Sequence, residues 1–345
     1  MRILFGVNGE GMGHAVRSKA IITELEKEHN VLVVAGGKAY PFLKKTFKTS
    51  KIGYMNIIYR NNGVSYFETL LYNILKFPVI FLWNLKLIAI MLMFKPQVVI
   101  TDFEPFSCYA AILFGKKCIS IDNQHITNAD DYDKSILESI FMRFMIPWAD
   151  YYLVTTFFYP KVIKKDTYLF PPINREEIIK TKPKKGNFIL VYQTSKSNRK
   201  LIPALRKINE NFVLYGLNKD KTLGNIRLKK FNEKEFVSDM AKCSAVISNG
   251  GFTVIGEALY LNKPVLSVPV KKQFEQIRNA HYLEILGYGK YCKEINEKEV
   301  KEFISNLAEY KRNLRAYKKE DNTKVIKKLK ELINSKIFKQ RGLIL

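Results

Sequence analysis

A glycine-rich loop that ends in a histidine follows the first apolar run of the chain. The loop, Asn8-Gly-Glu-Gly-Met-Gly-His14, separates residues 2–7, which we expect to form a buried strand, from residues 15–27, which we expect to form a helix. Gly11 and Gly13 permit a tight turn and let a ligand approach the backbone at a helix N-terminus. His14 could do chemistry there, because an imidazole exchanges a proton near neutral pH. The alternative is a histidine that caps the helix or lies on the surface.

The surroundings of these glycines exclude two common nucleotide loops. A dinucleotide-binding loop needs an acidic residue at the end of the second strand, and that strand ends in Val34-Ala-Gly-Gly37. A Walker A loop needs Gly-Lys-Ser or Gly-Lys-Thr, which does not occur here. The loop is therefore a candidate ligand site of another kind.

Two carboxylates follow a later expected strand. Asp102 and Glu104 come directly after residues 97–101. Because ligands bind at the carboxyl ends of strands in open α/β sheets, Asp102 could orient His14 through one ring nitrogen and leave the other free to accept a proton. Glu104 is the competing carboxylate, and an Asp102 that caps the next helix is the alternative. The run Asp122-Asn-Gln-His125 ends the next strand and could line the same site.

The third group lies in the second half of the chain. The run Ser248-Asn-Gly-Gly-Phe-Thr-Val-Ile-Gly-Glu257 predicts a strand that turns at Gly250 and Gly251 into a helix, whose first N–H groups favour an anion such as a diphosphate. Thr253 can donate a hydroxyl, and Glu257 lies far enough along the helix to reach a ribose diol.

Two further segments belong with this group. Lys263-Pro-Val-Leu-Ser-Val-Pro269 predicts the next strand, and Glu275-Gln-Ile-Arg-Asn-Ala280 lies on the next helix. Gln276 and Asn279 fall one turn apart there, so both could face one site. Each segment alone could be an ordinary turn or helix face, and the three in this order favour a nucleotide.

These residues resemble the signature of GT-B glycosyltransferases, both the MurG-like group and the wider UDP-glycosyltransferase superfamily. The signature appears here as Gly250-Gly251, Glu257, Lys263-Pro264, Glu275-Gln276 and Asn279-Ala280. The N-terminal half is similar as well, because His14 and Asp102 match the positions where the superfamily keeps its base histidine and the carboxylate that holds it.

The resemblance implies an inverting, metal-independent and cofactor-independent transfer of a hexose or N-acetylhexosamine. The donor would be a nucleoside diphosphate sugar, with UDP as the expected carrier, and the acceptor a hydroxyl group. His14, held by Asp102, would take the acceptor proton, and the helix start at Gly250-Gly251-Phe252-Thr253 would stabilise the leaving diphosphate. The substrate-binding residues that we infer from it are Gly11, Gly13, Arg17, Glu104, Thr194, Ser195, Phe231, Gly250, Gly251, Phe252, Thr253, Glu257, Glu275, Gln276 and Asn279.

Some positions depart from the family pattern. Ala15-Val-Arg-Ser18 follows His14 where MurG has a Pro-Ala pattern, so the MurG acceptor cannot be carried over. Asn249 replaces the histidine that opens the plant-type donor signature, and Glu275 replaces its commoner aspartate. The identities of the sugar and the acceptor are therefore left open.

The elements that must position these residues alternate between short apolar runs and helical stretches. Such alternation predicts an α/β fold with parallel strands, here two doubly wound Rossmann-like domains that face each other across a cleft. We expect an acceptor-binding domain at residues 1–168, a linker containing Pro171-Pro172 at 169–186, a nucleotide-sugar-binding domain at 187–335, and a tail at 336–345.

Composition limits the alternatives. Of the 345 residues, 47% are hydrophobic and 26% are charged, which excludes intrinsic disorder. Four cysteines without metal spacing exclude a disulfide scaffold and, with only four histidines, argue against a zinc protein. The net charge is +25, yet no recognition motif for nucleic acid is present, so sequence-specific nucleic-acid binding is not expected. The charge fits a well-solvated surface, or attraction to anionic lipid headgroups or phosphorylated substrates.

Residues 77–94 form the most apolar stretch of the chain. Asn84 and Lys86 lie in its middle, and a lysine there costs about 2.5–3.5 kcal/mol on membrane-insertion scales. We expect a core helix first, a helix that lays an apolar face on a membrane surface second, and a transmembrane span third. The chain opens on an expected strand rather than a signal peptide, which favours the cytoplasm. The second possibility would place the protein on the inner face of the cell membrane and would suit a lipid-linked acceptor or a cell-surface glycan precursor.

Three other functions stay open on the sequence. A nucleotide-sugar epimerase of the same fold would consume the donor without an acceptor. A nicotinamide-dependent oxidoreductase lacks its expected acid after the second strand. A non-catalytic protein that binds a membrane surface would ignore nucleotide sugars.

Overall fold

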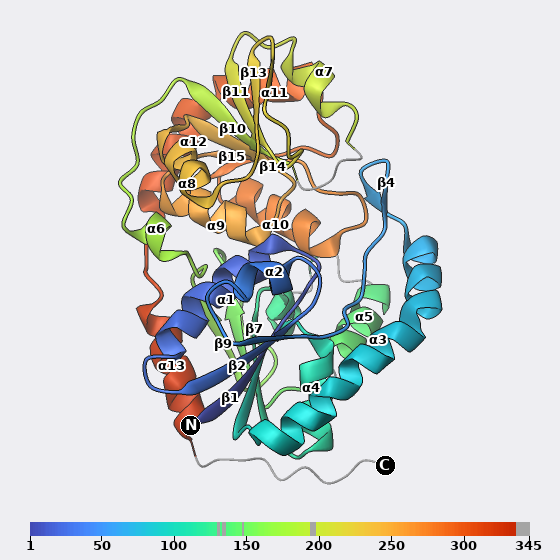
Figure 1. The fold of residues 1–345 in the computed structure, drawn as a ribbon. Coiled ribbons are helices and arrows are strands. Elements are labelled where there is room, and N and C mark those ends of the chain that lie inside the picture. Colours follow the sequence, from blue (N-terminus) through green and yellow to red (C-terminus); the bar gives the residue numbers. More distant parts are fainter. Residues whose placement is uncertain (130–131, 133–135, 147, 194–197, 336–345) are drawn as a thin grey trace. The chain divides into compact units, whose positions relative to one another are not determined.

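The computed structural model describes residues 1–129, 132, 136–146, 148–193 and 198–335 (Figure 1). The chain divides into two compact units, each built on a seven-stranded sheet. Unit 1 comprises Met1–Ile57, Phe67–Ile173 and Glu320–Leu345, and unit 2 comprises Ile58–Tyr66 and Asn174–Lys319. The predicted α/β class with two parallel-sheet domains is confirmed.

The sheet of unit 1 is parallel throughout and has the strand order β3-β2-β1-β6-β7-β8-β9. Its inner strands are apolar runs that are buried along almost their whole length, as parallel strands covered on both faces require. The order reverses between β1 and β6, so the ends of these two strands form the switch point at which open α/β sheets bind ligands. The strands are β1 (Arg2–Val7), β2 (Asn30–Ala35), β3 (Thr49–Lys51), β6 (Val98–Asp102), β7 (Lys117–Asp122), β8 (Tyr151–Thr155) and β9 (Thr167–Phe170).

The last described helix of the chain, α13, belongs to the core of unit 1. Its apolar residues, among them Leu329 and Ile333, pack in one buried cluster with β1 and α1. Lys117 at the start of β7 donates from Nζ to the carbonyl oxygen of Leu332 at 3.0 Å, which satisfies a carbonyl at the helix C-terminus. The helices of this unit are α1 (Met12–Leu25), α2 (Ala39–Leu43), α3 (Tyr66–Phe94), α4 (Pro105–Leu113), η1 (Gln124–Asn128), α5 (Ile136–Met145) and α13 (Thr323–Asn334).

The boundaries of the two units differ from the expected ones. Residues 320–335, expected in the second domain, belong to unit 1, because the apolar side of α13 is buried in the unit 1 core. The expected linker at 169–186 is shorter, because β9 joins the unit 1 sheet and α6 (Glu176–Ile179) already belongs to unit 2. The predicted tail at 336–345 lies outside the described residues.

The sheet of unit 2 has the order β12-β13-β11-β10-β14-β15-β16 and is parallel except for the edge pair of β12 and β13. Its strand order reverses between β10 and β14, which gives this unit a switch point of its own. The strands are β10 (Phe188–Tyr192), β11 (Asn211–Tyr215), β12 (Lys221–Leu223), β13 (Ile226–Lys229), β14 (Ala245–Ser248), β15 (Val265–Ser267) and β16 (Gly289–Tyr291). The helices are α6, α7 (Leu201–Leu205), α8 (Glu233–Lys242), α9 (Phe252–Tyr260), α10 (Phe274–Ile285), α11 (Glu297–Ser305), α12 (Leu307–Asn313) and η2 (Leu314–Ala316).

A hairpin from the first part of the chain completes unit 2. It consists of β4 (Tyr59–Arg60) and β5 (Gly63–Val64). Val64 N donates to the carbonyl oxygen of Lys271 at 2.9 Å, and Lys271 N donates to that of Asn62 at 2.8 Å. The sequence did not predict this hairpin, because its strands are too short to show an apolar pattern.

The helix α3 contradicts the expectation of a core helix at residues 77–94. It is a 29-residue helix with a mean hydropathy of 2.1 in its most apolar window, and only 17% of that window is buried. Among the described residues it is the one helix long and apolar enough to cross a membrane. The side chains that it buries are Asn73, Ile80, Leu87 and Met91.

Candidate active site

The site of unit 1 begins at the switch point between β1 and β6. Val7 and Asp102, at the ends of these strands, are partners in the parallel register. Asn8 ties the two outgoing loops together, because its backbone N–H donates to the carbonyl oxygen of Asp102 at 3.1 Å and its Nδ2 donates to that of Phe103 at 2.8 Å. Phe103 adopts a φ of +52°, a conformation that non-glycine residues rarely take and that clusters at functional sites.

The structure brings His14 and Asp102 together. His14 lies in the first turn of α1, whose N-cap is Gly11 and which includes Gly13, and its Nδ1 is 2.8 Å from Oδ1 of Asp102. The Asp102 side chain is fully buried, whereas 15% of the His14 side chain is exposed. Burial alone would raise the pKa of Asp102, but the charges of Arg17 and His14 and their hydrogen bonds lower it to about 2. Asp102 is therefore ionised at neutral pH.

Arg17 is a partner of Asp102, and the expectation that it binds substrate stays a prediction. It is 3% exposed, its Nε donates to Oδ2 of Asp102 at 2.8 Å, and its Nη1 donates to Oδ1 of Asn123 at 2.6 Å. Ser18 Oγ donates to the same Oδ2 at 2.8 Å. Arg17 and Ser18 lie one helical turn after His14, and this spacing places them on the same face of α1 as His14. The sequence did not show that both side chains contact Asp102.

The protonation state of Nδ1 of His14 decides with which neighbour this atom forms a hydrogen bond. Nδ1 is 2.8 Å from Asp102 Oδ1 and 2.8 Å from Arg17 Nη2. A protonated Nδ1 donates to the carboxylate, and an unprotonated Nδ1 accepts from the guanidinium. Only the first arrangement leaves Nε2 of His14 able to accept a proton. This ring nitrogen lies 3.5 Å from the side-chain amide nitrogen of Gln124.

Glu104 caps α4, and the expectation that it binds substrate stays a prediction. Its Oε1 accepts from the backbone N–H of Phe106 at 2.9 Å and its Oε2 from that of Ser107 at 2.7 Å. The side chain is buried, so both oxygens are used inside the protein. Burial raises the pKa of Glu104 to about 6, although these hydrogen bonds oppose the rise.

The raised pKa of Glu104 predicts a pH-dependent stability. As the pH falls from about 6 to 4.5, the folded protein binds a proton at Glu104 that the unfolded chain does not yet hold. The free energy of unfolding should therefore gain up to about 2 kcal/mol from this group across that window. Urea titrations of the wild type and of Glu104→Gln, which lacks the titrating group, isolate this contribution. Identical pH dependences of the two proteins would contradict the buried, ionised carboxylate.

A second acid–histidine pair follows β7. Asp122 Oδ2 lies 2.7 Å from Nδ1 of His125, and Oδ1 accepts from the backbone N–H of His125 at 2.8 Å. Both side chains are buried, and the Phe103 ring has its centroid 6.4 Å from that of His14 and 6.2 Å from that of His125. The run at 122–125 thus borders the His14 site, as the sequence suggested, through Asn123 and Gln124.

The candidate donor site lies at the switch point of unit 2, in the turn between β14 and α9. Gly250 has a φ of +81°, and a Cβ there would lie 2.8 Å from Ser267 Oγ and 2.9 Å from the carbonyl oxygen of Gln276. Asn279 Nδ2 donates to the carbonyl oxygen of Gly250 at 3.0 Å, and Gln276 Oε1 accepts from Val270 N at 3.0 Å. Asn279 therefore braces the turn and Gln276 holds the chain after β15, while the contact of either side chain with a ligand stays a prediction.

Gly251 differs from its neighbour. It is the N-cap of α9 with ordinary extended backbone, φ −63° and ψ 128°, and no side chain caps the helix. A Cβ on Gly251 would meet nothing within 4 Å among the described residues. Among the described residues, the turn is thus packed tightly on the side of Gly250 and open at Gly251.

Glu257, on α9, holds a partner that the sequence did not reveal. Its Oε1 accepts from Arg175 Nε at 2.6 Å and its Oε2 from Nη2 at 3.2 Å, and the side chain is fully buried. Arg175 Nη1 also lies 3.2 Å from Glu233. Burial raises the pKa of Glu257, and the adjacent guanidinium opposes that rise. A ribose contact at Glu257 stays a prediction and would share the carboxylate with Arg175.

The remaining predicted residues that the structure describes belong to unit 2, and two of them adjoin Gly251. Phe252 and Thr253 are buried in the first turn of α9, and Glu275 lies half-buried in the first turn of α10. Phe231 is 40% exposed, and its ring is in an edge contact with Tyr215. Thr194 and Ser195 lie outside the described residues.

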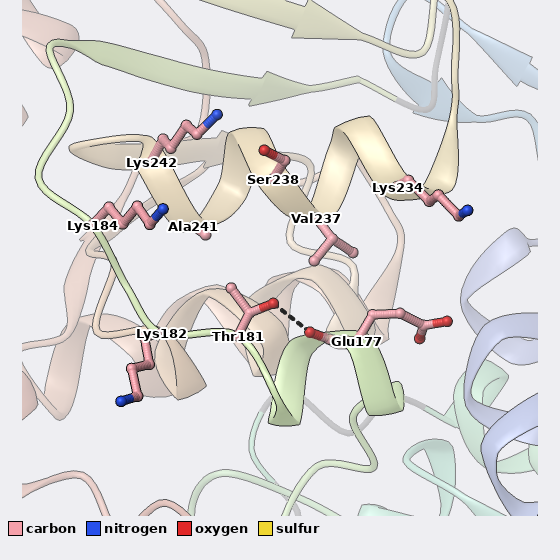
Figure 2. A pocket seen from close by; sticks show the side chains of 9 residues that line it. All are labelled: Glu177, Thr181, Lys182, Lys184, Lys234, Val237, Ser238, Ala241 and Lys242. Atoms are coloured by element: carbon pink, nitrogen blue, oxygen red, sulfur yellow. Dashed lines mark hydrogen bonds between the residues drawn. The ribbon is translucent and has the colours of Figure 1, made fainter.

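A surface pocket between α6 and α8 holds none of the predicted residues (Figure 2). Figure 2 shows that two of its lysines, Lys182 and Lys242, point in opposite directions. The positive charges therefore do not converge on one point, and we assign no ligand to this pocket.

Comparisons with known proteins agree with this architecture. The family model described as Glycosyl transferase family 1 matches residues 1–308. A Methanosarcina mazei protein named as an uncharacterized glycosyltransferase is 24% identical over 326 residues, 84% of this chain and 85% of that protein. A Bacillus cereus UDP-N-acetylglucosamine–N-acetylmuramyl-(pentapeptide) pyrophosphoryl-undecaprenol N-acetylglucosamine transferase 3 is 26% identical over 136 residues, 35% of this chain and 38% of that protein.

The fold is shared with solved glycosyltransferases. The spinosyn forosaminyltransferase SpnP superimposes with a TM-score of 0.68 at 12% sequence identity, covering 97% of this chain and 100% of that one. At this identity the likeness concerns the fold alone. Because the family match runs from the loop that ends at His14 through the turn at Gly250 and beyond, the chain belongs to glycosyl transferase family 1 and is a glycosyltransferase with the two-domain GT-B fold.

Proposed function

We propose that the protein transfers a sugar from a nucleoside diphosphate sugar to a hydroxyl group of an acceptor, with inversion at the anomeric carbon and without a metal ion. The observation that carries this proposal is the turn at Gly250 and Gly251, which the described residues pack closely at Gly250 and leave open at Gly251, the N-cap of α9. A diphosphate at such a terminus meets backbone N–H groups and the positive end of the helix dipole.

The donor side stabilises the leaving group. As the bond between the anomeric carbon and the β-phosphate oxygen breaks, its electron pair adds negative charge to the diphosphate. The N-terminus of α9, which is fixed before the reaction, stabilises that charge without reorganising. In this proposal the helix replaces the divalent cation that other nucleotide-sugar enzymes use.

The acceptor side supplies the base. His14, with its Nδ1 proton donated to Asp102, accepts the hydroxyl proton of the acceptor at Nε2 while the oxygen bonds to the anomeric carbon. Asp102 stabilises the imidazolium that forms, and Arg17 and Ser18 hold Asp102 in place. Because the oxygen attacks from the face opposite the leaving group, the configuration inverts.

UDP is the first carrier to test, and a hexose or N-acetylhexosamine the first sugar. The resemblance to the UDP-glycosyltransferase superfamily supports this choice, as does the name of the Bacillus cereus relative, which acts on a UDP-linked sugar. That name also supports a lipid-linked acceptor as the first acceptor class. Phe231 is exposed, and we expect the nucleotide base to lie beside it.

The two glycines of the α9 turn should respond differently to alanine. Gly251→Ala should lower the stability of the free protein by no more than about 1 kcal/mol, because alanine is a poorer N-cap than glycine but the added methyl meets no described atom. It should nevertheless weaken the binding of nucleoside diphosphates about ten-fold or more, because the methyl occupies the space where the diphosphate approaches. Thermal-shift titrations with UDP, dTDP and GDP measure both quantities.

Gly250→Ala is the matched control. It should lower the stability of the free protein by about 1–3 kcal/mol, since its φ of +81° and its close neighbours are incompatible with a Cβ. Full nucleotide affinity in Gly251→Ala would contradict the proposed donor site.

A further inference from the structure

We propose that the outward face of α3 docks this protein on the surface of an anionic lipid bilayer. The inference is independent of the proposed reaction, because it rests on the exposure and charge of one helix. Exposed apolar residues run along α3 from its first turn to its last, and among the largest exposed fractions are 76% at Phe67, 71% at Leu75, 64% at Leu82 and 84% at Met93. At 1.5 Å per residue this face is about 43 Å long.

A narrow seam holds α3 to unit 1. Asn73 Nδ2 donates to the carbonyl oxygen of Asn56 at 2.8 Å, and Asn56 N donates back to Asn73 Oδ1 at 2.9 Å. Gly53 lets the helix approach closely, because a Cβ there would lie 2.6 Å from the carbonyl oxygen of Ile80. Asn73, Ile80, Leu87 and Met91 recur at helical spacing, so the buried residues form one stripe and leave the opposite side of the helix outward.

Other helices of unit 1 add to the apolar surface. Leu113 at the end of α4 is 73% exposed, and Ile140 and Phe144 of α5 are 61% and 54% exposed. Tyr109 of α4 donates from its hydroxyl to the carbonyl oxygen of Phe144 at 2.8 Å, which joins the two helices. In the view of Figure 1, α3, α4 and α5 lie on one flank of unit 1. Exposed apolar surface of this extent marks a binding face.

The charges around α3 select an anionic lipid surface as the partner. The chain contains no acidic residue from Thr69 to Thr101, whereas Lys76, Lys86 and Lys95 fall in that stretch. The Nζ atoms of Lys86 and Lys51 lie 4.1 Å and 4.8 Å from the centre of the Trp83 ring. A tryptophan with flanking lysines suits the headgroup region, where the ring is half-immersed and the ammonium groups meet phosphates.

The same observations disfavour two other roles for the exposed face of α3, a transmembrane span and a contact with a second copy of the chain. A transmembrane span would have to break the seam that ties α3 to unit 1 from Asn73 to Met91. A second copy of the chain would bring together two molecules that each carry a net charge of +25, and such like charges repel at low salt. An anionic bilayer attracts this charge and also accepts the apolar face.

The two tryptophans of the chain make the proposal directly testable. Trp148→Phe leaves Trp83 as the single fluorescent reporter on α3. With vesicles of phosphatidylglycerol and phosphatidylcholine at low salt, the protein should cosediment, and lipids brominated in the upper acyl chain should quench Trp83. Vesicles of phosphatidylcholine alone should bind about ten-fold less protein, and about 0.5 M salt should release much of it.

Two double variants separate the apolar and electrostatic contributions. Leu75→Glu with Leu82→Glu should reduce vesicle binding about ten-fold or more at unchanged melting temperature, because both side chains are exposed. Lys51→Gln with Lys86→Gln should weaken binding to anionic vesicles only. Ile285→Glu is the matched control, since Ile285 is a 63% exposed apolar residue of α10 in unit 2, and it should bind as the wild type does.

Three results would overturn the proposal. The first is no cosedimentation with anionic vesicles at low salt. The second is binding that leaves Trp83 unquenched and survives the double leucine substitution, which would place the contact on another basic surface. The third is a lipid-free dimer in sedimentation velocity that the same double substitution dissociates.

Discussion

His14→Ala should lower the turnover of sugar transfer by about 10²–10⁴-fold and leave nucleotide affinity unchanged. The alanine removes the group that accepts the acceptor proton, while the α9 turn in unit 2 keeps its structure. The measurement is turnover of the sugar donor and donor affinity on the same preparation, with a lipid-linked hydroxyl acceptor or with water as the acceptor.

Two variants control this result. Asp102→Asn keeps the shape of the side chain but removes its charge, so it should lower turnover while nucleotide affinity stays unchanged. His29→Ala removes an imidazole from the same unit at a distance from the site and should leave turnover unchanged. A His14→Ala protein with more than about a tenth of wild-type turnover would contradict the assignment of the base.

Arg175→Ala should lower the free energy of unfolding by about 3–5 kcal/mol. The reason is that Glu257, which is fully buried, would lose the guanidinium that donates to both of its oxygens. An unpaired buried carboxylate must be protonated or hydrated before the unit can fold, and either costs free energy. Chemical denaturation of the wild type and the variant at neutral pH measures the loss.

A double variant shows whether the unpaired charge is the cause. Arg175→Met with Glu257→Leu removes both charges and fills much of the same volume, so it should recover most of the stability that Arg175→Ala loses. Glu233→Gln is the milder control, because Glu233 is only one of two carboxylates on Arg175 and is less buried than Glu257. Equal stabilities of the single and the double variant would show that the loss is one of packing rather than of charge.

The sequence predicted those features that follow from the rules of parallel sheets. The alternation of strands and helices gave the fold class. From the rule that ligands bind at the carboxyl ends of strands, the sequence indicated that Asp102 could orient His14. In the structure the two side chains are in contact, and Val7 and Asp102 are register partners. The sequence also predicted a turn at Gly250-Gly251 between a strand and a helix, and in the structure Gly250 has the positive φ.

Contacts between side chains that lie far apart in the sequence could not be predicted. The sequence offered Asp102 as a possible helix cap, and the start of α4 at Pro105 gives that place to Glu104 instead. Arg175 and Glu257 lie far apart in the chain, and no local pattern pairs them. The burial of the helices α3 and α13 could not be predicted from the sequence either. Both carry apolar residues, but the apolar side of α13 is buried in the unit 1 core, whereas only 17% of the most apolar window of α3 is buried.

The central claim is that the start of α9 binds the diphosphate of a sugar donor. Amide hydrogen exchange tests it most directly, comparing the free protein with the protein at about 1 mM UDP, dTDP or GDP. We predict that at least one nucleotide slows exchange most strongly in the peptide that contains residues 250–257. A nucleotide that binds but leaves exchange in this peptide unchanged, or the absence of binding by all three, would contradict the claim.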